Sequence, residues 1–373
     1  MKPYYLIKVN GENVTKKLKD LGLTLTITDQ LDSHADTAQI DITDPNMILQ
    51  RPETGAEVYI EAGWEEQGEP RKFGKFRIDQ RSVNGFPVTI SISAQTIDAK
   101  SAVKEQRTKA YPNKDYPTYG DIFREIASRN GWSPAIADRI DNEPNDYEAQ
   151  SEENDIAFAT RLKEKLDAGV SIKDGHMVIN DKASGESVTG KKIPAINVAL
   201  GVNLISFSAS EVDKPKFSKV EASWFDRNKV EHKFQSSAAS EEGPTFHIRH
   251  PFQTEEEARR AARSKAREIT RSEGSARFTI NGDPFAMAGA EVEVSGLGYG
   301  VYGKWHAVRV VHTFSGSSAY TTEIECEAPT GGAKKGLGEQ PKVTGSASTA
   351  PVPTPEPTGP TLVGSGLLGD GPE

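Results

Sequence analysis

The chain has 373 residues, more than the roughly 250 to 300 at which a single hydrophobic core stops growing, so we expect two or more structural units. Its formal net charge of −9 at pH 7 argues against a protein that holds nucleic acid, because such proteins present an excess of Lys and Arg to the phosphates. The single cysteine, Cys326, excludes an intramolecular disulfide framework and fits assembly in a reducing cytoplasm.

Neither a membrane span nor an export signal is predicted. No stretch approaches the roughly 20 apolar residues that cross a bilayer, and the opening residues MKPYYLIKVNGENV lack the longer apolar core of a signal peptide. We therefore expect no stable membrane binding and no Sec export.

Residues 1–100 are predicted to form a first antiparallel β-barrel domain. Apolar and polar side chains alternate over 21–27 and again over 88–94, and this period of two is typical of strands with one buried face. The dipeptide Asn10-Gly11 predicts a type I′ turn that closes an early hairpin.

Residues 101–188 are predicted to form a small α+β insertion domain. The spacing Thr118-x-x-Asp121 favours a capping box at the start of a helix, and Asn130-Gly131 favours its end. A second helix is predicted over residues 153–168, ended by Ala168-Gly169, and a hairpin is expected to turn at Asp174-Gly175.

Residues 189–330 are predicted to form a second β-barrel domain with a flanking helix near 254–271 that begins at Thr254-x-x-Glu257. One side of that helix is mostly alanine, which suits close approach to another backbone. The opposite side is basic and carries Arg259, Arg260, Arg263, Arg267 and Arg271. Two interpretations of the basic side stay open, a solvated helix surface and a contact with an acidic neighbour.

Residues 331–373 are rich in Gly, Pro, Ser and Thr and are predicted to be a C-terminal tail without a core of its own. Its apolar side chains Leu362, Val363, Leu367 and Leu368 are candidate partner-binding residues. The alternative is a disordered terminus.

Two motifs suggest chemistry that the surrounding residues do not support. The run Gly298–Gly303 satisfies G-x-G-x-x-G, but Trp305 follows Lys304 where a phosphate loop has Ser or Thr, and a strand follows where it has a helix. His247 and His250 lack the further ligands that zinc normally takes. No nucleotide, cofactor or metal site is predicted.

The remaining titratable residues favour structural roles. His312 lies on a strand row and is predicted to be a hydrogen-bonded core histidine rather than a general base, and Cys326 is predicted to be a packed apolar residue. The carboxylate pairs Asp41 with Asp44 and Glu291 with Glu293 come with no sign of an acid pocket, so they do not indicate a glycosidase. No catalytic residue is predicted.

Residues 282–328 are predicted to form three alternating strands joined by Gly-rich turns, with nothing catalytic on them. This favours a barrel against which other proteins dock. The predicted inward rows are Val292 and Val294, then Val308, Val310 and His312, then Ile324 and Cys326.

The order of segments in this stretch resembles the late control gene D family, the tail hub proteins of contractile-tailed phages, which are related to the hub part of type VI secretion spike proteins. The resemblance extends upstream through Phe158 and Leu162 and covers roughly residues 4–328. It is carried by Gly282-Asp283-Pro284, Ala288-Gly289, Val310-Val311-His312, Ala319-Tyr320-Thr321-Thr322 and the upstream run 151–155.

The resemblance implies a structural baseplate hub, not an enzyme. It implies a homotrimer whose paired barrels form a ring, joining the hexameric tail tube to the trimeric spike around a channel for DNA ejection. Further implied partners are the tape-measure protein and baseplate wedge or neighbouring baseplate proteins, in a virion assembled in the host cytoplasm. A tail-associated peptidoglycan hydrolase, and the hub of a phage-tail-like bacteriocin or secretion spike, are the alternatives.

Charge adds a mechanistic hypothesis. Three copies carry 3 × −9 = −27 charges. If part of that acidity lines the channel, duplex DNA is repelled from the wall and passes without adhering.

Overall fold

The structure is a computed structural model, and it is mainly β. It describes residues 1–19, 21–31, 35–50, 52–96, 105–173, 175–182, 188, 192–211, 217–226, 229–239, 243–271, 274–298, 301–316 and 319–328. In this described part, no helix is long and apolar enough to cross a membrane.

The N-terminal stretch folds as antiparallel strands, as its alternation predicts. The turn at Asn10-Gly11 has φ of 48° and 86°, which confirms the predicted backbone of a type I′ turn. On β3 every second residue is buried, including Leu23, Leu25 and Ile27. The elements are β1 (Pro3–Val9), β2 (Glu12–Asn13), α1 (Thr15–Lys19), β3 (Gly22–Gln30), β4 (Thr37–Thr43), β5 (Glu57–Trp64), β6 (Arg71–Asn84) and β7 (Thr89–Gln95).

The insertion has its own buried cluster, formed between two helices and short strands. Its elements are β8 (Arg107–Pro112), α2 (Tyr119–Arg129), β9 (Ser133–Ile136), α3 (Asp138–Asp141), β10 (Tyr147–Glu153), α4 (Asp155–Leu166), β11 (Ala168–Lys173) and β12 (His176–Asp181). The capping box is confirmed, since the Thr118 hydroxyl accepts from the Asp121 amide and the Asp121 carboxylate accepts from the Thr118 amide.

The predicted end of the second helix at Ala168-Gly169 is wrong by about two residues. Helix α4 ends at Leu166, and Asp167 takes the left-handed conformation with φ of 50°. Gly169 is already in β11, where a Cβ atom would meet Asn180 Oδ1 at 2.3 Å, so the glycine serves close packing between strands. The predicted hairpin turn includes Gly175, with φ of 77°, while Asp174 lies outside the described residues.

The C-terminal stretch divides between two sheets. Strands β15, β16 and β17 form a small separate sheet, against which α5 packs through Ala258, Ala262 and Ala266. The elements are β13 (Ile196–Ala199), β14 (Leu204–Glu211), β15 (Lys219–Asp226), β16 (Glu231–Ala238), β17 (Thr245–Phe252), α5 (Glu255–Arg271), β18 (Gly274–Asn281), β19 (Glu291–Ser295), β20 (Gly303–Ser315) and β21 (Ala319–Glu327).

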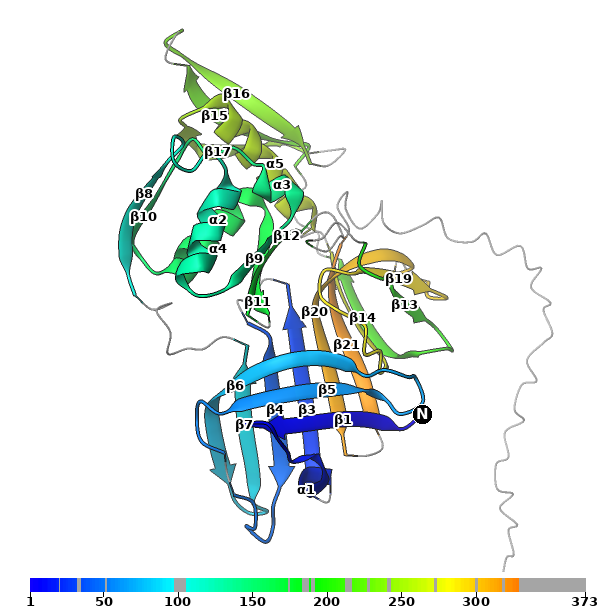
Figure 1. Ribbon diagram of the computed structural model, residues 1–373. Coiled ribbons are helices and arrows are strands. Elements are labelled where there is room, and N and C mark those ends of the chain that lie inside the picture. The colour runs from blue at the N-terminus through cyan, green and yellow to red at the C-terminus, as the bar shows by residue number, and fades with distance from the viewer. Residues whose placement is uncertain are drawn as a thin grey trace, which may run out of the picture. The chain divides into compact units, whose positions relative to one another are not determined.

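One 13-stranded sheet contains strands from both ends of the chain. Its order is β14-β18-β21-β20-β3-β4-β7-β6-β5-β1-β2, with β19 pairing both β13 and β20. The antiparallel pair β3–β20 joins the N-terminal strands to the C-terminal ones, which lie side by side in Figure 1. Buried apolar residues of this sheet form two clusters, one mainly from β1 to β7 and one from β13 and β18 to β21.

One predicted inward row is partly wrong. Val310, His312 and Phe314 are buried, but Val308 is only half-buried and Ala307 is buried instead. The register of β20 on β21 shifts between Ala307 and Arg309, so a β-bulge at Val308 reverses the alternation. The rows on β19 and β21 are confirmed.

The Gly282 backbone ties the two ends of the sheet together. Its carbonyl accepts from Trp64 Nε1 at 2.7 Å, and its amide donates to the Tyr320 carbonyl at 3.0 Å. A Cβ atom at this position would meet the Tyr320 ring at 2.1 Å, and that ring stacks on Phe314 at a centroid distance of 4.0 Å.

We expect Gly282→Ala to lower the free energy of unfolding by about 1–3 kcal/mol, because the buried Tyr320 ring has no room to move away. The measurement is the urea midpoint of the full chain. Gly298→Ala is the matched control, since nothing lies within 4 Å of a Cβ there. Equal midpoints for both variants would contradict the close packing.

Candidate assembly site

The free edge of the large sheet carries exposed apolar side chains. Among the described strands β14 pairs only with β18, so its outer backbone groups are available to another chain. Ile205 is 55% exposed and Phe207 is 45% exposed on this edge strand, which also carries exposed serines. Soluble monomers usually protect such edges with charge or proline, and β14 has neither before its last residue, Glu211.

The turn that precedes the strand also carries exposed apolar side chains. Leu200 and Val202 are exposed there, and Val202 lines a hollow of about 820 Å³ together with Phe285, which is also exposed. We call Leu200, Val202, Ile205, Phe207 and Phe285 the β14 patch. Several exposed apolar side chains on and beside an edge strand make it a candidate interaction site.

A buried ionic cluster joins three separate segments beside the β3–β20 pair. Lys173 at the end of β11 donates to Asp29 on β3 at 2.5 Å and lies 3.3 Å from Asp36. Arg71 lies 3.5 Å from Asp29 and donates to the carbonyls of Pro284 and Ala286. The cluster therefore links the insertion to both β-rich stretches.

Burial sets the protonation of this cluster. Burial would raise the pKa of Asp29, but the adjacent Lys173 and Arg71 lower that pKa overall, so Asp29 is ionised. Burial, assisted by Asp29, raises the pKa of Asp36 to about 6 against the opposing effect of Lys173. Burial and Arg71 lower the pKa of His312 to about 3, so the imidazole is neutral.

The prediction that His312 is a hydrogen-bonded core residue is confirmed. Its Nε2 lies 3.2 Å from the Ala286 carbonyl and its Nδ1 lies 2.9 Å from the Tyr320 hydroxyl. A carbonyl only accepts, so Nε2 carries the proton and Nδ1 accepts from Tyr320. Both nitrogens are thereby engaged in structural bonds.

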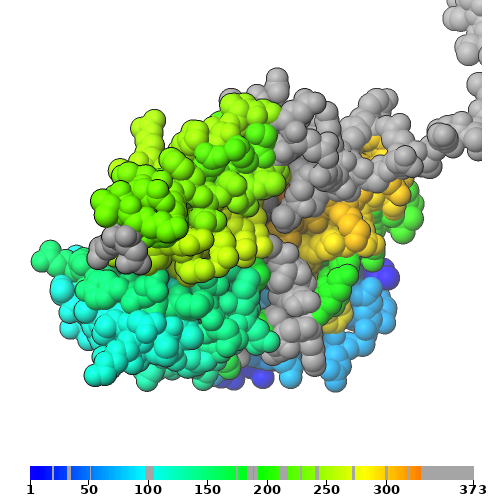
Figure 2. Space-filling model, turned by 90° about the horizontal axis from the view of Figure 1, so that it is seen from above, coloured from blue at the N-terminus to red at the C-terminus, as the bar shows by residue number. Residues whose placement is uncertain are grey.

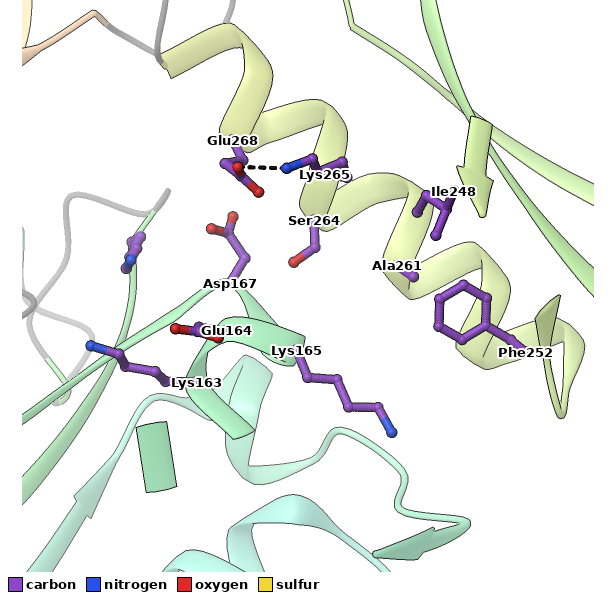
Figure 3. A pocket seen from close by; sticks show the side chains of 11 residues that line it. Lys163, Glu164, Lys165, Asp167, Ile248, Phe252, Ala261, Ser264, Lys265 and Glu268 are labelled. Atoms are coloured by element: carbon purple, nitrogen blue, oxygen red, sulfur yellow. Dashed lines mark hydrogen bonds and ion pairs between the residues drawn. The ribbon is translucent and has the colours of Figure 1, made fainter. Parts of the chain in front are cut away.

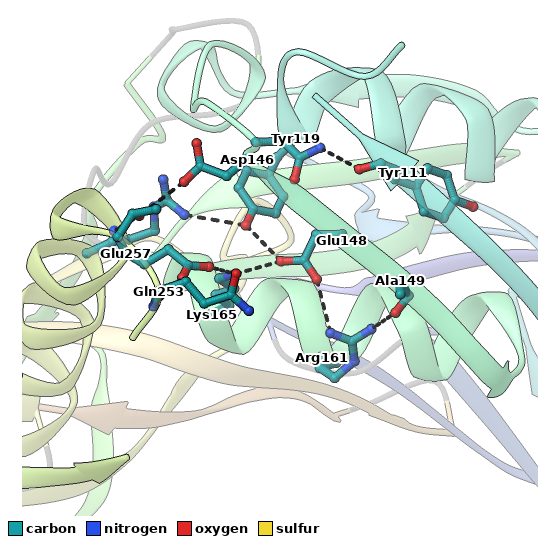
Figure 4. Close-up of polar contacts among 12 residues, drawn as sticks. Tyr111, Tyr119, Asp146, Glu148, Ala149, Arg161, Lys165, Gln253 and Glu257 are labelled. Atoms are coloured by element: carbon teal, nitrogen blue, oxygen red, sulfur yellow. Dashed lines mark hydrogen bonds and ion pairs between the residues drawn. The ribbon is translucent and has the colours of Figure 1, made fainter. Parts of the chain in front are cut away.

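A second polar network joins α5 to the insertion (Figure 4). Glu148 accepts from Tyr119 at 2.8 Å and from Lys165 at 2.6 Å, and Lys165 also donates to Glu257 on α5 at 2.9 Å. Burial raises the pKa of Tyr119 to about 12, so the hydroxyl remains a donor. Arg161 adds a further ion pair to Glu148 at 3.2 Å.

The basic side of α5 shows both arrangements that the sequence left open. Arg260 pairs with Glu143 of the insertion at 2.7 Å, and Arg267 lies 3.6 Å from Asp167. Arg259 is exposed and pairs with Glu256 of its own helix. A cavity of about 550 Å³ lies between α4 and α5, and Figure 3 shows Lys165, Asp167 and Ser264 among its lining residues.

The residues of the Gly-rich run and of the carboxylate pairs make structural contacts. Lys304 pairs with Glu291 at 2.6 Å and Trp305 is buried in β20, so the predicted strand after the Gly-rich turn is confirmed. Asp41 accepts from Ser91, and Asp44 accepts from the backbone amides of residues 48 and 49.

Two further predictions concern histidines and the cysteine. His247 and His250 are exposed on β17, and His247 Nδ1 lies 3.4 Å from Glu221. Cys326 is buried as predicted, and burial raises the pKa of its thiol. Across the described residues no group of three or more His, Cys, Asp or Glu is placed to hold a metal ion.

The candidate partner-binding residues Leu362, Val363, Leu367 and Leu368 lie outside the described residues. The β14 patch is the surface that sequence reasoning missed. Sequence alternation can indicate a strand, but it does not reveal that the strand lies at a sheet edge.

The large antiparallel sheet, the small helical insertion and the exposed apolar edge define a protein with the fold of phage tail hubs. The chain belongs to the phage tail baseplate hub (GPD) family, whose model matches residues 99–318. This confirms the resemblance seen in the sequence. The match contains the insertion and most of the C-terminal stretch, while the N-terminal strands lie outside it.

Known proteins agree with this assignment. The probable baseplate hub protein of Escherichia phage 186 is 27% identical over 196 residues, which are 52% of this chain and 49% of that protein, so the chain spans about half the length of this curated relative.

Among solved structures, the 43 kDa tail protein of prophage MuSo2 from Shewanella oneidensis has a TM-score of 0.64 at 15% identity, over 87% of this chain and 98% of that one. An E. coli type VI secretion component, described as similar to the T4 bacteriophage tail proteins gp27 and gp5, has a TM-score of 0.53 at 11% identity over 86% of this chain and 76% of that one. At sequence identities this low, the similarity shows a shared fold and nothing more.

The ionic cluster predicts opposite pH effects for two residues. The folded-state pKa of Asp36 is raised, so its charge costs stability above about pH 6 and the cost vanishes near pH 4. We expect Asp36→Asn to raise the free energy of unfolding at pH 7.5 by about 1–3 kcal/mol and to have little effect at pH 4.

The neutral imidazole of His312 makes stability depend on pH in the opposite direction. Its folded pKa of about 3 lies below the ordinary value of 6.5, so stability is lost as the pH falls between these values. In Asp36→Asn this acid loss is no longer offset, and urea unfolding from pH 4 to 6 should show stability rising more steeply with pH than in the parent chain. If Asp36→Asn changes the free energy of unfolding equally at pH 7.5 and at pH 4, the pKa of Asp36 is not raised.

Proposed function

We propose that the chain is the structural hub of a contractile tail baseplate and acts as a homotrimeric adaptor between a hexameric tail tube and a trimeric spike. Membership of the baseplate hub family supports the assignment to the baseplate. The β14 patch carries the trimer, because an apolar edge strand with free backbone groups offers both hydrogen bonds and apolar contacts to a neighbouring copy.

The adaptor function would depend on the shape of the assembled ring and would require no chemical reaction. The two buried clusters of the large sheet support two barrels per chain, so three chains would present six similar barrels in a ring. The six similar barrels would match the sixfold symmetry of the tube on one side of the ring. The three chains would match the threefold symmetry of the spike on the other side. The chain's role is thus to match two symmetries by surface shape, and no catalytic role is proposed.

The further partners follow from this position. We propose contacts with the spike, the tube, the tape-measure protein and neighbouring baseplate or wedge proteins, in a virion whose tail is assembled in the host cytoplasm. The ring would surround the channel for DNA ejection, and the trimer charge of 3 × −9 = −27 would keep duplex DNA from adhering.

A second assignment has a specific observation in its favour. The fold likeness to an E. coli type VI secretion component supports the hub part of a secretion spike, or of a phage-tail-like bacteriocin, built on the same architecture. Neighbouring genes distinguish these systems, because capsid genes accompany only a phage tail.

Trimerisation is tested by light scattering after size exclusion, alone and with a coexpressed spike. We expect a mass three times the chain mass of 40.5 kDa. Ile205→Glu and Phe207→Glu should each give monomers, since a charge in an apolar interface loses its water without gaining a partner. Val83→Glu, at an equally exposed apolar residue on β6, should leave the trimer intact. A parent chain that stays monomeric with the spike present would overturn the adaptor role.

The C-terminal tail is proposed to dock on another tail protein through its apolar residues. Changing Leu362, Val363, Leu367 and Leu368 together to Ser should reduce the yield of complete tails in a complementation assay, while the light-scattering mass of the purified hub should not change. Normal tail yield from this variant, or from deletion of residues 331–373, would end the docking proposal.

A further inference from the structure

A pocket dominated by arginine lies between α5 and the insertion. Its volume is about 360 Å³, and five guanidinium groups line it, those of Arg139, Arg259, Arg260, Arg263 and Arg267. Two elements contribute them, since Arg139 lies on α3 and the other four lie on α5. We call this pocket the arginine cleft. Figure 2 shows the segment that contains α5 packed against the insertion, the two parts that form its walls.

The spacing of these arginines is unfavourable for the helix by itself. Arg259, Arg263 and Arg267 follow one another at four-residue intervals, so their side chains share one face and repel each other. The chain as a whole is acidic, with a net charge of −9, so the concentration of positive charge is local. An arrangement that destabilises a helix locally is expected where the charges serve binding.

Not all of these guanidinium groups are used by the fold. Arg139 donates to Asp181 and to the Leu166 carbonyl, and Arg260 pairs with Glu143. By contrast, Arg263 is exposed, and the described residues provide it with no ion-pair partner.

The two neighbours of Arg263 on the same face are engaged to different degrees. Arg259 is half-exposed and pairs within its own helix, and Arg267 lies 3.6 Å from Asp167, at the outer limit of an ion pair. The Arg259–Glu256 pair is exposed, and an exposed pair contributes little, so it yields readily to a better partner. Asp167 is buried, so the pair with Arg267 belongs to the fold.

The basic surface extends beyond the cleft. The neighbouring cavity of about 550 Å³ shares Asp167 and Ser264 with the arginine cleft, and four lysines line it, Lys163, Lys165, Lys182 and Lys265. The two cavities together offer nine basic side chains and five distinct acidic ones. A bound chain several residues long would therefore meet more basic than acidic side chains across the two cavities.

We propose that the arginine cleft binds a carboxylate-rich segment of a partner protein. The planar guanidinium fork donates two parallel hydrogen bonds to a carboxylate, and a pocket of about 360 Å³ accommodates Asp and Glu side chains that enter individually. Acidic residues, Glu143 and Glu256 among them, line the cleft together with the arginines. These carboxylates repel the continuous phosphate row of a nucleic acid, whereas separate acidic side chains can each approach a guanidinium group.

The test uses the full chain and a fluorescein-labelled hexaglutamate peptide, with hexaglutamine and an oligothymidylate of equal charge as comparison probes. We expect saturable binding of hexaglutamate in fluorescence anisotropy, weakened by salt. Arg263→Glu should lower this affinity by at least about tenfold, and Arg263→Lys by less, because Lys keeps the charge and loses the fork.

Arg249→Glu is the matched control, because Arg249 is an exposed arginine on the neighbouring strand β17 and outside both cavities. It should change the affinity by less than about twofold. Both arginines are exposed, so equal urea midpoints show that neither variant acts by unfolding. Hexaglutamate binding is also measured with the Ile205→Glu chain, so the result does not depend on whether the chain forms a trimer. The proposal rests on the hub function only in placing the partner protein in the tail.

Three results would overturn the proposal. One is the absence of saturable hexaglutamate binding at low salt. The second is an equal loss of affinity in Arg249→Glu and Arg263→Glu, which would show general attraction by surface charge. The third is tighter binding of the oligothymidylate that also depends on Arg263, which would assign the cleft to nucleic acid.

Discussion

The pairing of β3 with β20 is the constraint on which the large sheet depends. It brings residues 24–30 against residues 309–315, two segments that lie nearly the whole chain apart. Phe314 on β20 then packs on Tyr5 and Tyr320 inside the N-terminal cluster. The N-terminal strands therefore complete their core with side chains from the other end of the chain, so the two β-rich stretches depend on each other for stability.

Strand β20 contributes side chains to both apolar cores along its length. Before the bulge at Val308, Trp305 and Ala307 point into the C-terminal cluster, and beyond it Val310 does the same while Phe314 enters the N-terminal cluster. His312 lies between these two positions and is held by polar partners. The buried polar layer beside β20 thus lies where the apolar cores meet, and its bonds fix the register that an apolar contact alone would leave free to slip.

Local sequence patterns predicted the elements, and non-local contacts decided the rest. The capping residue Thr118 and the Asn10-Gly11 turn act within a few residues of themselves, so the sequence was sufficient to place them. The bulge at Val308 depends on a partner strand, and Lys173 meets Asp29 across 144 positions. Periodicity contains no information on such pairs, nor on which strand is left at an edge, which is why the β14 patch was not foreseen.

The two buried ionic networks link separate elements within the fold, so interaction with other molecules is left to the exposed surfaces. The β14 patch is apolar and lies at a sheet edge, and contacts of that kind are insensitive to salt and suit a permanent assembly of identical copies. The arginine cleft is charged and its Arg263 is exposed, so contacts made there weaken with salt and suit a partner that arrives later or leaves. A protein built this way separates two tasks physically, since changing the charge in the cleft leaves the apolar edge intact. On the proposed assignment, the β14 patch would hold the three copies of the hub together, and the arginine cleft would bind a neighbouring tail protein.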